Sequence, residues 1–232
     1  MKIREPLYLS VKFEAWREDG QWESNKDIWQ KIRQDILDRD HHTCGYCGFP
    51  ATKFQEVHHI DNDHDNNSEE NLVTICSLCH ACHHIGLAGA LKRGTLVYLP
   101  EITQQDLHWM IRWISLSVYS DDMGGYLDTP RRMFSEFLIH RKKMCEARMG
   151  TSDPVTIGNT LLKFGETAFS ENATRALTPI RMVPALIGDK DIDYLHGYDE
   201  ERKKHWKEQM KLLVPDMTQI MEYINAGVIN KN

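Results

Sequence analysis

Two hydrophobic patterns open the chain, and they predict different elements. From residue 7 to residue 13 apolar and polar residues alternate, and this period of two predicts a half-buried strand. Its apolar positions are Leu7, Leu9, Val11 and Phe13. From residue 28 onward apolar residues recur at helical spacing, which predicts a helix just before the first cysteine. The apolar positions of that helix are Ile28, Trp29, Ile32, Ile36 and Leu37.

The second half of the chain predicts mostly helices. Apolar residues at helical spacing follow Thr103, which forms a weak capping box with Asp106. Thr129-Pro130 and Asp153-Pro154 each place a proline at the first position of a further helix, where proline is tolerated. Residues 120–125 have the composition of a linker. A charged helical tail runs from residue 199 to 227 with a break at Pro215, and it either caps the core or docks on a partner.

The predicted helix after Pro130 has an apolar stripe and a basic face. We expect the stripe to face the core; it comprises Met133, Phe134, Phe137, Leu138 and Met144. The basic residues are Arg131, Arg132, Arg141, Lys142, Lys143 and Arg148. Such a run either binds nucleic-acid phosphates with salt-sensitive affinity or is simply a solvated face. The sequence leaves both interpretations open.

Composition narrows the class of protein. With 232 residues, 41% of them hydrophobic, and a net charge of −6, the chain has room for one domain with extensions or two small ones. It is too apolar for a disordered protein and has no global positive field for nucleic acid. No apolar run approaches the roughly 20 residues that span a bilayer, and the N-terminus lacks the pattern of a signal peptide. We therefore expect a cytoplasmic protein without an integral membrane segment.

Cysteines and histidines gather in one stretch. Residues 41–84 hold five of the six cysteines and eight of the twelve histidines. Without export features, paired cysteines are typical metal ligands rather than disulfides. Cys44 and Cys47, and Cys76 and Cys79, have the two-residue gap that lets two thiolates bind one Zn²⁺. We expect one structural Zn²⁺ held by these four residues; the alternative is buried free thiols. Cys82 leaves an ambiguity, because it forms a similar pair with Cys79.

The residues between the two cysteine pairs follow a known order. His58-His59-Ile60 is followed by a polar loop, then Asn71-Leu72, and then a cysteine five residues after the asparagine. This order resembles the HNH, or ββα-metal, nuclease motif over about residues 25 to 88. The spacing from Asn71 in the zinc-stapled branch of that family favours Cys76 and Cys79 as the second zinc pair. The polar run from residue 61 to 65 lacks the glycine and distal glutamate of a calcium loop, so we interpret it as a solvated turn.

The HNH resemblance implies a fold. We expect an α+β protein in which a zinc-stapled ββα-metal module is followed by a mostly helical C-terminal region. The module would occupy residues 1–93, a range that includes the N-terminal strand and helix. The helical region would occupy residues 94–232 and pack on the module as one compact unit.

The same resemblance implies roles for the polar residues. Adjacent residues of an extended segment point to opposite faces, so His58 and His59 cannot do the same job. By the resemblance, His59 is the general base, for which imidazole suits neutral pH, and Asn71 orients the base or its loop. His58 and His80 would bind a catalytic cation. His84 is a further candidate for contact with metal or phosphate, as is its neighbour His83.

The resemblance also bears on the identity of the cation. Many family members have aspartate where His58 stands. An imidazole there shifts preference from Mg²⁺ toward softer cations such as Mn²⁺, Ni²⁺ or Zn²⁺. The second divalent cation is therefore open among Mg²⁺, Mn²⁺ and Ni²⁺.

A second resemblance covers more of the chain. The strings GTLVYLPEITQ at 94–104 and GTSDP at 150–154, behind the Cys44-x-x-Cys47-Gly-Phe start, are not general HNH features. Together they resemble the IcmJ/DotN family of type IVB secretion and conjugation systems, over roughly residues 25 to 165. The resemblance implies a coupling-complex component at the cytoplasmic side of the inner membrane that binds the coupling ATPase. Members of that family can lack the histidine pair, which this chain keeps.

These resemblances give two functional hypotheses. The first is a zinc-stabilised adaptor that docks on the coupling ATPase and its complex. The second is an active metal-dependent endonuclease that hydrolyses phosphodiester bonds, with DNA as one candidate substrate and His59 as base. The sequence favours the adaptor, because the family resemblance spans more of the chain than the nuclease motif.

Overall fold

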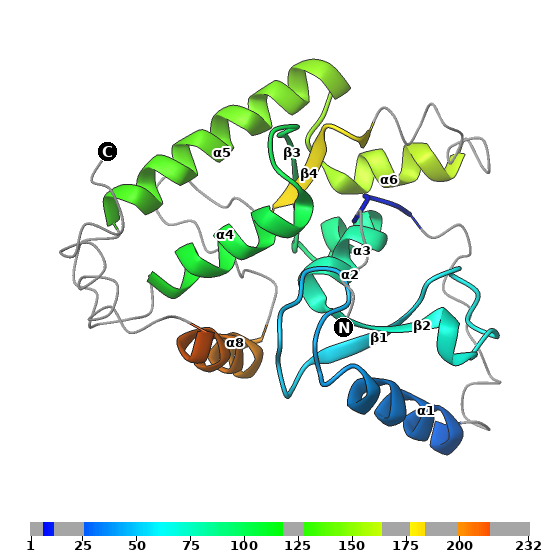
Figure 1. Cartoon of the computed structure of the whole chain (residues 1–232). Helices are drawn as coiled ribbons and strands as arrows, with labels where there is room; N and C mark the ends of the chain where they lie inside the picture. The colour runs from blue at the N-terminus through cyan, green and yellow to red at the C-terminus, as the bar shows by residue number, and fades with distance from the viewer. Residues whose placement is uncertain (1–6, 12–25, 118–127, 164–176, 184–198, 214–232) are drawn as a thin grey trace.

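The computed structural model describes residues 7–11, 26–117, 128–163, 177–183 and 199–213 (Figure 1). Helices and short two-stranded sheets alternate along these residues, which confirms the expected α+β class. In chain order the elements are α1 (Lys26–Arg39), β1 (Gln55–His59), the 3-10 turn η1 (Glu69–Asn71), β2 (Leu72–Cys76), α2 (Ser77–His83), α3 (Ile85–Ala90), β3 (Thr95–Tyr98), α4 (Gln104–Ser117), α5 (Asp128–Met149), α6 (Pro154–Lys163), β4 (Ile180–Val183) and α8 (Glu200–Leu213).

The ββα unit lies where the motif placed it. Strands β1 and β2 pair in antiparallel register, with His58 opposite Val73 and His59 opposite Leu72. Helix α2 begins at Ser77, directly after β2, and packs on both strands. Helix α1, which the sequence predicted, packs against the same two strands. The histidines of β1 and the helix that closes the motif are therefore held together by adjacent chain segments.

The C-terminal elements build a second sheet and cover it. Strands β3 and β4 pair in antiparallel register, and α4 and α5 pack against them. In Figure 1 this sheet lies between α5 and α6. Helix α6 crosses α3 at close range, because an ideal Cβ on Gly158 would lie only 3.0 Å from the Cα of Gly86. The missing side chain of Gly158 is what lets the two backbones approach, whereas a Cβ on Gly86 would meet nothing within 4 Å.

One buried cluster joins both parts of the chain. It includes Phe49 and Ile85 from the cysteine-rich part and Leu96, Ile157 and Trp206 from the helical part. A smaller cluster lies beneath α4 and α5. The division at residue 93 stays a prediction, but buried residues on both sides of it pack against one another.

Residues 7–11 correct one expectation. Their burial alternates as predicted, with Leu7 and Val11 buried and Tyr8 49% exposed. They form no strand, however, because their backbone pairs with the α2–α3 junction: Ser10 N donates to Cys82 O and Ile85 N donates to Ser10 O. Residues 12 and 13 of the predicted strand lie outside the described residues.

The helix starts largely agree with the sequence. The capping box forms, since Thr103 Oγ1 donates to Asp106 Oδ2 at 2.6 Å and accepts from Asp106 N at 3.1 Å. Helix α6 begins at Pro154, and α5 begins at Asp128, two residues before the proline expected to start it. The predicted linker at 120–125 and the tail beyond residue 213 lie outside the described residues. Among the described helices, none is both long and apolar enough to cross a bilayer.

The prediction that the apolar stripe of α5 faces the core is wrong at the N-terminal end of the helix. Leu138 is fully buried, but Met133 is 63% exposed and Phe137 is 37% exposed. Only part of this long helix packs on β3 and α4, so helical spacing alone did not reveal which turns find a partner. Cys145 replaces Met144 as the most buried side chain of the last turns.

Candidate metal centres

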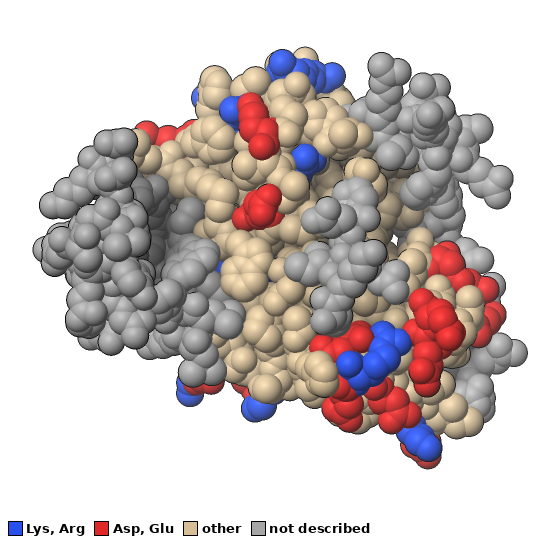
Figure 2. Space-filling model, in the orientation of Figure 1, with Lys and Arg blue, Asp and Glu red and all other residues tan. Residues whose placement is uncertain are grey.

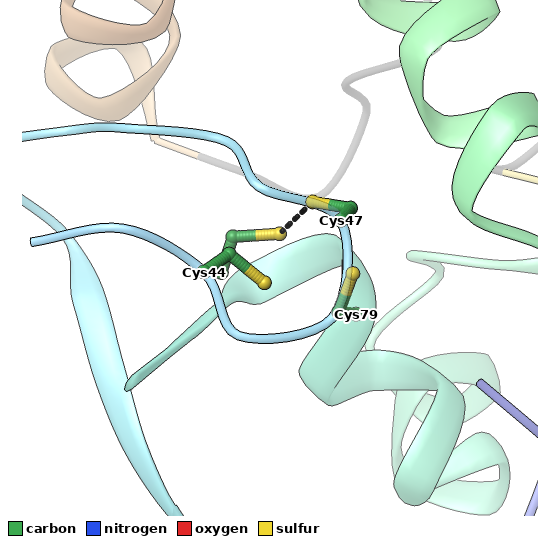
Figure 3. A group of neighbouring side chains, drawn as sticks. Cys44, Cys47 and Cys79 are labelled. Carbon is green, nitrogen blue, oxygen red and sulfur yellow. Dashed lines mark hydrogen bonds between the residues drawn. The ribbon is translucent and has the colours of Figure 1, made fainter. Parts of the chain in front are cut away.

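Four cysteines converge on one small space. Cys44 and Cys47 come from the loop after α1, Cys76 ends β2 and Cys79 lies in the first turn of α2. All four are buried, and their Sγ atoms lie within 4.8 Å of one another. Figure 3 shows Cys44, Cys47 and Cys79 with their sulfur atoms turned toward one another.

These sulfurs fit a tetrahedral zinc. Four sulfurs about 2.3 Å from one Zn²⁺ stand about 3.8 Å apart, and Cys47 Sγ and Cys76 Sγ are 3.7 Å apart. A tight turn brings Cys44 and Cys47 together. In this turn Gly48 N donates to Cys44 O, and Gly48 has φ +72°, a conformation that favours glycine. The cluster can therefore hold the structural zinc expected from the spacing.

Cys82 lies outside this cluster. It is buried on α2, and its Sγ donates to Leu78 O at 3.5 Å, a contact within the helix. Burial raises the pKa of the Cys82 thiol well above its ordinary value. The structure thus resolves the ambiguity of the sequence in favour of Cys76 and Cys79.

A buried arginine contacts two of the four sulfurs. Arg112 of α4 donates from Nη2 to Cys76 Sγ at 2.9 Å and from Nη1 to Cys47 Sγ at 3.5 Å. Burial lowers the pKa of Arg112, but the negative charge of the surrounding cysteine thiolates outweighs burial and holds the pKa above its ordinary value. Burial has the opposite effect on Cys47 and raises the pKa of its thiol. Hydrogen bonds from neighbouring cysteines and the charge of Arg112 outweigh burial and bring this pKa well below its usual range. Sequence reasoning missed Arg112, which lies far from the motif.

Three histidines form a second cluster. His58 of β1, His80 of α2 and His84 just beyond α2 place one ring nitrogen each within 4.8 Å of the others. His83 stacks on His58 with ring centroids 4.3 Å apart, and its Nε2 is buried and has no hydrogen-bond partner among the described residues. Burial, followed by the four neighbouring imidazoles, strongly lowers the pKa of His58. The lowered pKa keeps the imidazole neutral, and the neutral imidazole is the form that binds a transition metal.

Glu56 orients one of these histidines. Its Oε2 accepts from His80 Nδ1 at 2.5 Å, and its Oε1 accepts from Ser77 Oγ at 2.6 Å. Arg202 of α8 lies 3.8 Å from the same carboxylate. With Nδ1 engaged, His80 has Nε2 left for a cation, the arrangement common among metal-bound histidines. The sequence did carry a signal that was overlooked, because Glu56 and His58 are two residues apart on one face of β1.

His59 points away from the histidine cluster. Its ring stacks on Trp29 of α1 at 5.4 Å, and its Nε2 lies 2.9 Å from Asn67 Oδ1. The His64 ring lies close to the His59 ring, with centroids 4.9 Å apart. The opposite orientation of His58 and His59 agrees with their adjacency on a strand. The role of His59 as a base stays a prediction.

Asn71 organises the loop between β1 and β2. Its Oδ1 accepts from Asp61 N at 3.1 Å, and its Nδ2 donates to Asp61 Oδ1 and to Asn66 O, both at 2.8 Å. It makes no hydrogen bond with His59 among the contacts of the described residues. Residues 61–65 form an exposed turn held by side chain to backbone bonds, as in Asp63 N to Asp61 Oδ1 at 2.8 Å. Asn71 therefore contacts the loop rather than the predicted base.

Comparisons with known proteins extend over different parts of the chain. The family model described as HNH endonuclease matches residues 44–85. The type 4 apparatus protein DotN of Legionella pneumophila strain Philadelphia 1 is 31% identical over 161 residues, which are 68% of this chain and 73% of that protein. YajD of Escherichia coli strain K12, an HNH nuclease by name, is 39% identical over 70 residues, 28% of this chain and 61% of YajD. The Salmonella typhimurium YajD is 37% identical over the same length.

Proposed function

This chain belongs to the DotN family of type IV secretion proteins, and we propose that it is a zinc-stabilised adaptor that docks on the coupling ATPase of a type IVB secretion or conjugation apparatus. The observation that carries the proposal is the extent of the similarity. It covers 161 residues with DotN but only 70 with YajD. In this proposal the protein is cytoplasmic and reaches the inner membrane through its partner.

Exposed apolar side chains on α5 support a docking role. Met133 and Phe137 are one helical turn apart, so they lie on one face. Arg141, a further turn on, stacks over the Phe137 ring at 4.9 Å and pairs with Glu101 Oε1 at 2.8 Å. An apolar pair bordered by an anchored arginine has the composition of a protein interface. We assign this α5 surface, Met133, Phe137 and Arg141, to the coupling ATPase.

The charges of the described residues support a protein partner over nucleic acid. On the basic helix, Arg141 is paired, Lys142 binds Glu146 at 3.1 Å and Arg148 stacks over Tyr98 at 4.0 Å. Figure 2 shows acidic side chains gathered over the loop between β1 and β2 and over α1. The exposed acidic residues of that loop are Asp61, Asp63, Asp65, Glu69 and Glu70. Negative charge beside His59 repels a phosphodiester backbone.

Direct binding tests the adaptor. The zinc-loaded full chain would be mixed with the purified soluble part of the coupling ATPase from the same organism and run on size exclusion with light scattering. We expect a stoichiometric complex whose affinity falls at least tenfold in the double variant Met133→Ala/Phe137→Ala, since buried anchors dominate interfaces. Leu162→Ala, which removes a 39%-exposed apolar side chain of α6, is the matched control. Failure of the wild type to bind refutes the adaptor, and equal binding by the double variant refutes the α5 surface.

The endonuclease is the second candidate, and the histidine cluster is the observation that favours it. His58, His80 and His84 would hold a divalent cation, with Glu56 fixing His80. When bound, such a cation stabilises charge on the scissile phosphate and the leaving oxygen. His59 would accept the proton of the attacking water.

Plasmid nicking with Mg²⁺, Mn²⁺ and Ni²⁺ in turn tests the endonuclease. His59→Gln is the informative variant because its amide can still donate to Asn67 and fill the space beside Trp29. His140→Ala, an exposed histidine of α5, is the control. An active nuclease loses 10²- to 10⁴-fold in rate in His59→Gln and nothing in the control. Equal rates in all three proteins, or none, reject the endonuclease.

A further inference from the structure

One face of α4 lies against the four-cysteine cluster, although α4 is outside the residues that match the HNH family. Three side chains of this helix reach the cluster from positions 108, 109 and 112, which adjoin on a helix surface. Trp109 Nε1 donates to Cys47 O at 2.7 Å. The other two, Arg112 and His108, contact sulfur atoms.

Arg112 is held as a fixed cation. Its side chain is buried, with only 3% of the residue exposed. The guanidinium lies over the Phe49 ring at 4.1 Å and near the Trp109 ring at 5.6 Å, so it has little freedom to turn. From this position it spans two sulfurs, Cys47 Sγ and Cys76 Sγ, which belong to different cysteine pairs.

The tautomer of His108 follows from its hydrogen bonds. Gln104 Oε1 accepts from Met182 N at 2.9 Å and Gln104 Nε2 donates to Met182 O at 2.7 Å, which fixes the amide orientation. Gln104 Nε2 also lies 2.8 Å from His108 Nε2, which must therefore accept. The proton of the neutral ring is then on Nδ1, 3.4 Å from Cys79 Sγ. His108 thus donates to a third sulfur. Met182 of β4 fixes the Gln104 amide and thereby determines which nitrogen of His108 is the donor.

The net negative charge of a zinc ion bound by four thiolates explains why these contacts matter. Four thiolates and one Zn²⁺ carry a net charge of −2, and a buried charge is costly unless it is paired and hydrogen-bonded. Arg112 reduces the net charge to −1, and two side chains of α4 supply N–H donors to three of the four sulfurs. We propose that α4 forms the outer hydrogen-bonding shell of the zinc centre, with Arg112 as its charge-compensating positioning residue. Zinc retention and the docking of α4 are then coupled.

The test measures zinc release and a spectroscopic signature. Purified full-length protein would be assayed for zinc content, for the rate of zinc transfer to a chelator, and for the sulfur-to-metal charge-transfer band after Co²⁺ substitution. We expect Arg112→Met to release zinc 10- to 100-fold faster and to shift the Co²⁺ band, because outer partners have effects of this size. Arg112→Lys, which keeps the charge but loses the fork and the stacking, should lie between Arg112→Met and wild type. Arg148→Met, which removes another arginine stacked on an aromatic ring, that of Tyr98, should match wild type.

Each outcome decides the proposal. Wild-type release rates and an unshifted band in both Arg112 variants overturn it, as does wild-type protein purified without zinc. If Arg112→Met does not fold, Arg112→Lys decides alone: faster release with a shifted band supports the proposal, and wild-type behaviour overturns it. The result is independent of ATPase binding, so it does not stand or fall with the adaptor.

Discussion

Glu56→Gln should weaken any cation site at the histidine cluster without unfolding the protein. The glutamine has the same length, so its carbonyl can accept from His80 Nδ1 or from Ser77 Oγ, but it loses the negative charge that serves both. Loss of a carboxylate behind a metal-binding histidine costs 10- to 100-fold in affinity, or about 1.4 to 2.8 kcal/mol. We expect this loss for Ni²⁺ or Mn²⁺ binding to the zinc-loaded protein.

Isothermal titration of zinc-loaded wild type, Glu56→Gln and Glu70→Gln measures the effect. Glu70 is an exposed acidic residue of η1, so its variant controls for a change in net charge. Thermal unfolding of each protein confirms that they are folded. The reasoning is refuted if Glu56→Gln binds the cation as tightly as wild type, or if the two variants weaken binding equally. A wild type that binds no second cation shows that the histidine cluster is not a metal site.

Three further predictions concern stability and zinc. Asp40→Asn weakens the bond from Thr74 N, 2.8 Å from Asp40 Oδ2, and should cost about 1 to 2 kcal/mol at pH 7, measured by urea unfolding. Burial raises the pKa of Asp40, but the adjacent arginine and Thr74 outweigh it and lower the pKa. The stability gap between the two proteins should therefore be complete above the unfolded pKa of about 3.9 and close as pH falls through the lower folded pKa; a gap that widens in acid contradicts this. Gly158→Ala should destabilise by about 1 to 3 kcal/mol by crowding the α3–α6 crossing, whereas Gly86→Ala, whose added Cβ meets nothing within 4 Å, should not, and thermal unfolding separates them. Chelation of zinc should unfold the cysteine-rich part reversibly, as seen by circular dichroism, while Cys82→Ser should keep full zinc content; zinc loss in that variant would place Cys82 in the site.

Local spacing predicted the two cysteine pairs, and the HNH resemblance predicted the ββα unit and the choice of Cys76 and Cys79. Two-residue gaps and the distance from Asn71 to Cys76 are properties of neighbouring residues, and the fold keeps them. The helices at 26–39, 104–117 and 154–163 were predicted for the same reason, since apolar period and capping residues act within one or two turns.

Contacts between distant segments could not be predicted in this way. Arg112 and His108 approach the cysteines only because α4 packs on α2, about 30 residues away in sequence. A buried arginine within an apolar helical pattern gives no sign of which charge it meets. The exposure of Met133 and Phe137 was missed because periodicity identifies a face but not its partner. Residues 7–11 likewise showed their burial in sequence and not the backbone groups they bond.

Complementation of a strain that lacks this gene tests the central claim most directly. Transfer through the type IV apparatus would be measured with wild type, His59→Gln and Met133→Ala/Phe137→Ala, each shown to be folded and zinc-loaded at equal abundance. An adaptor predicts that His59→Gln restores transfer fully and that the α5 double variant does not. Restoration by the α5 variant together with failure of His59→Gln would contradict the account and assign the essential role to the histidine chemistry.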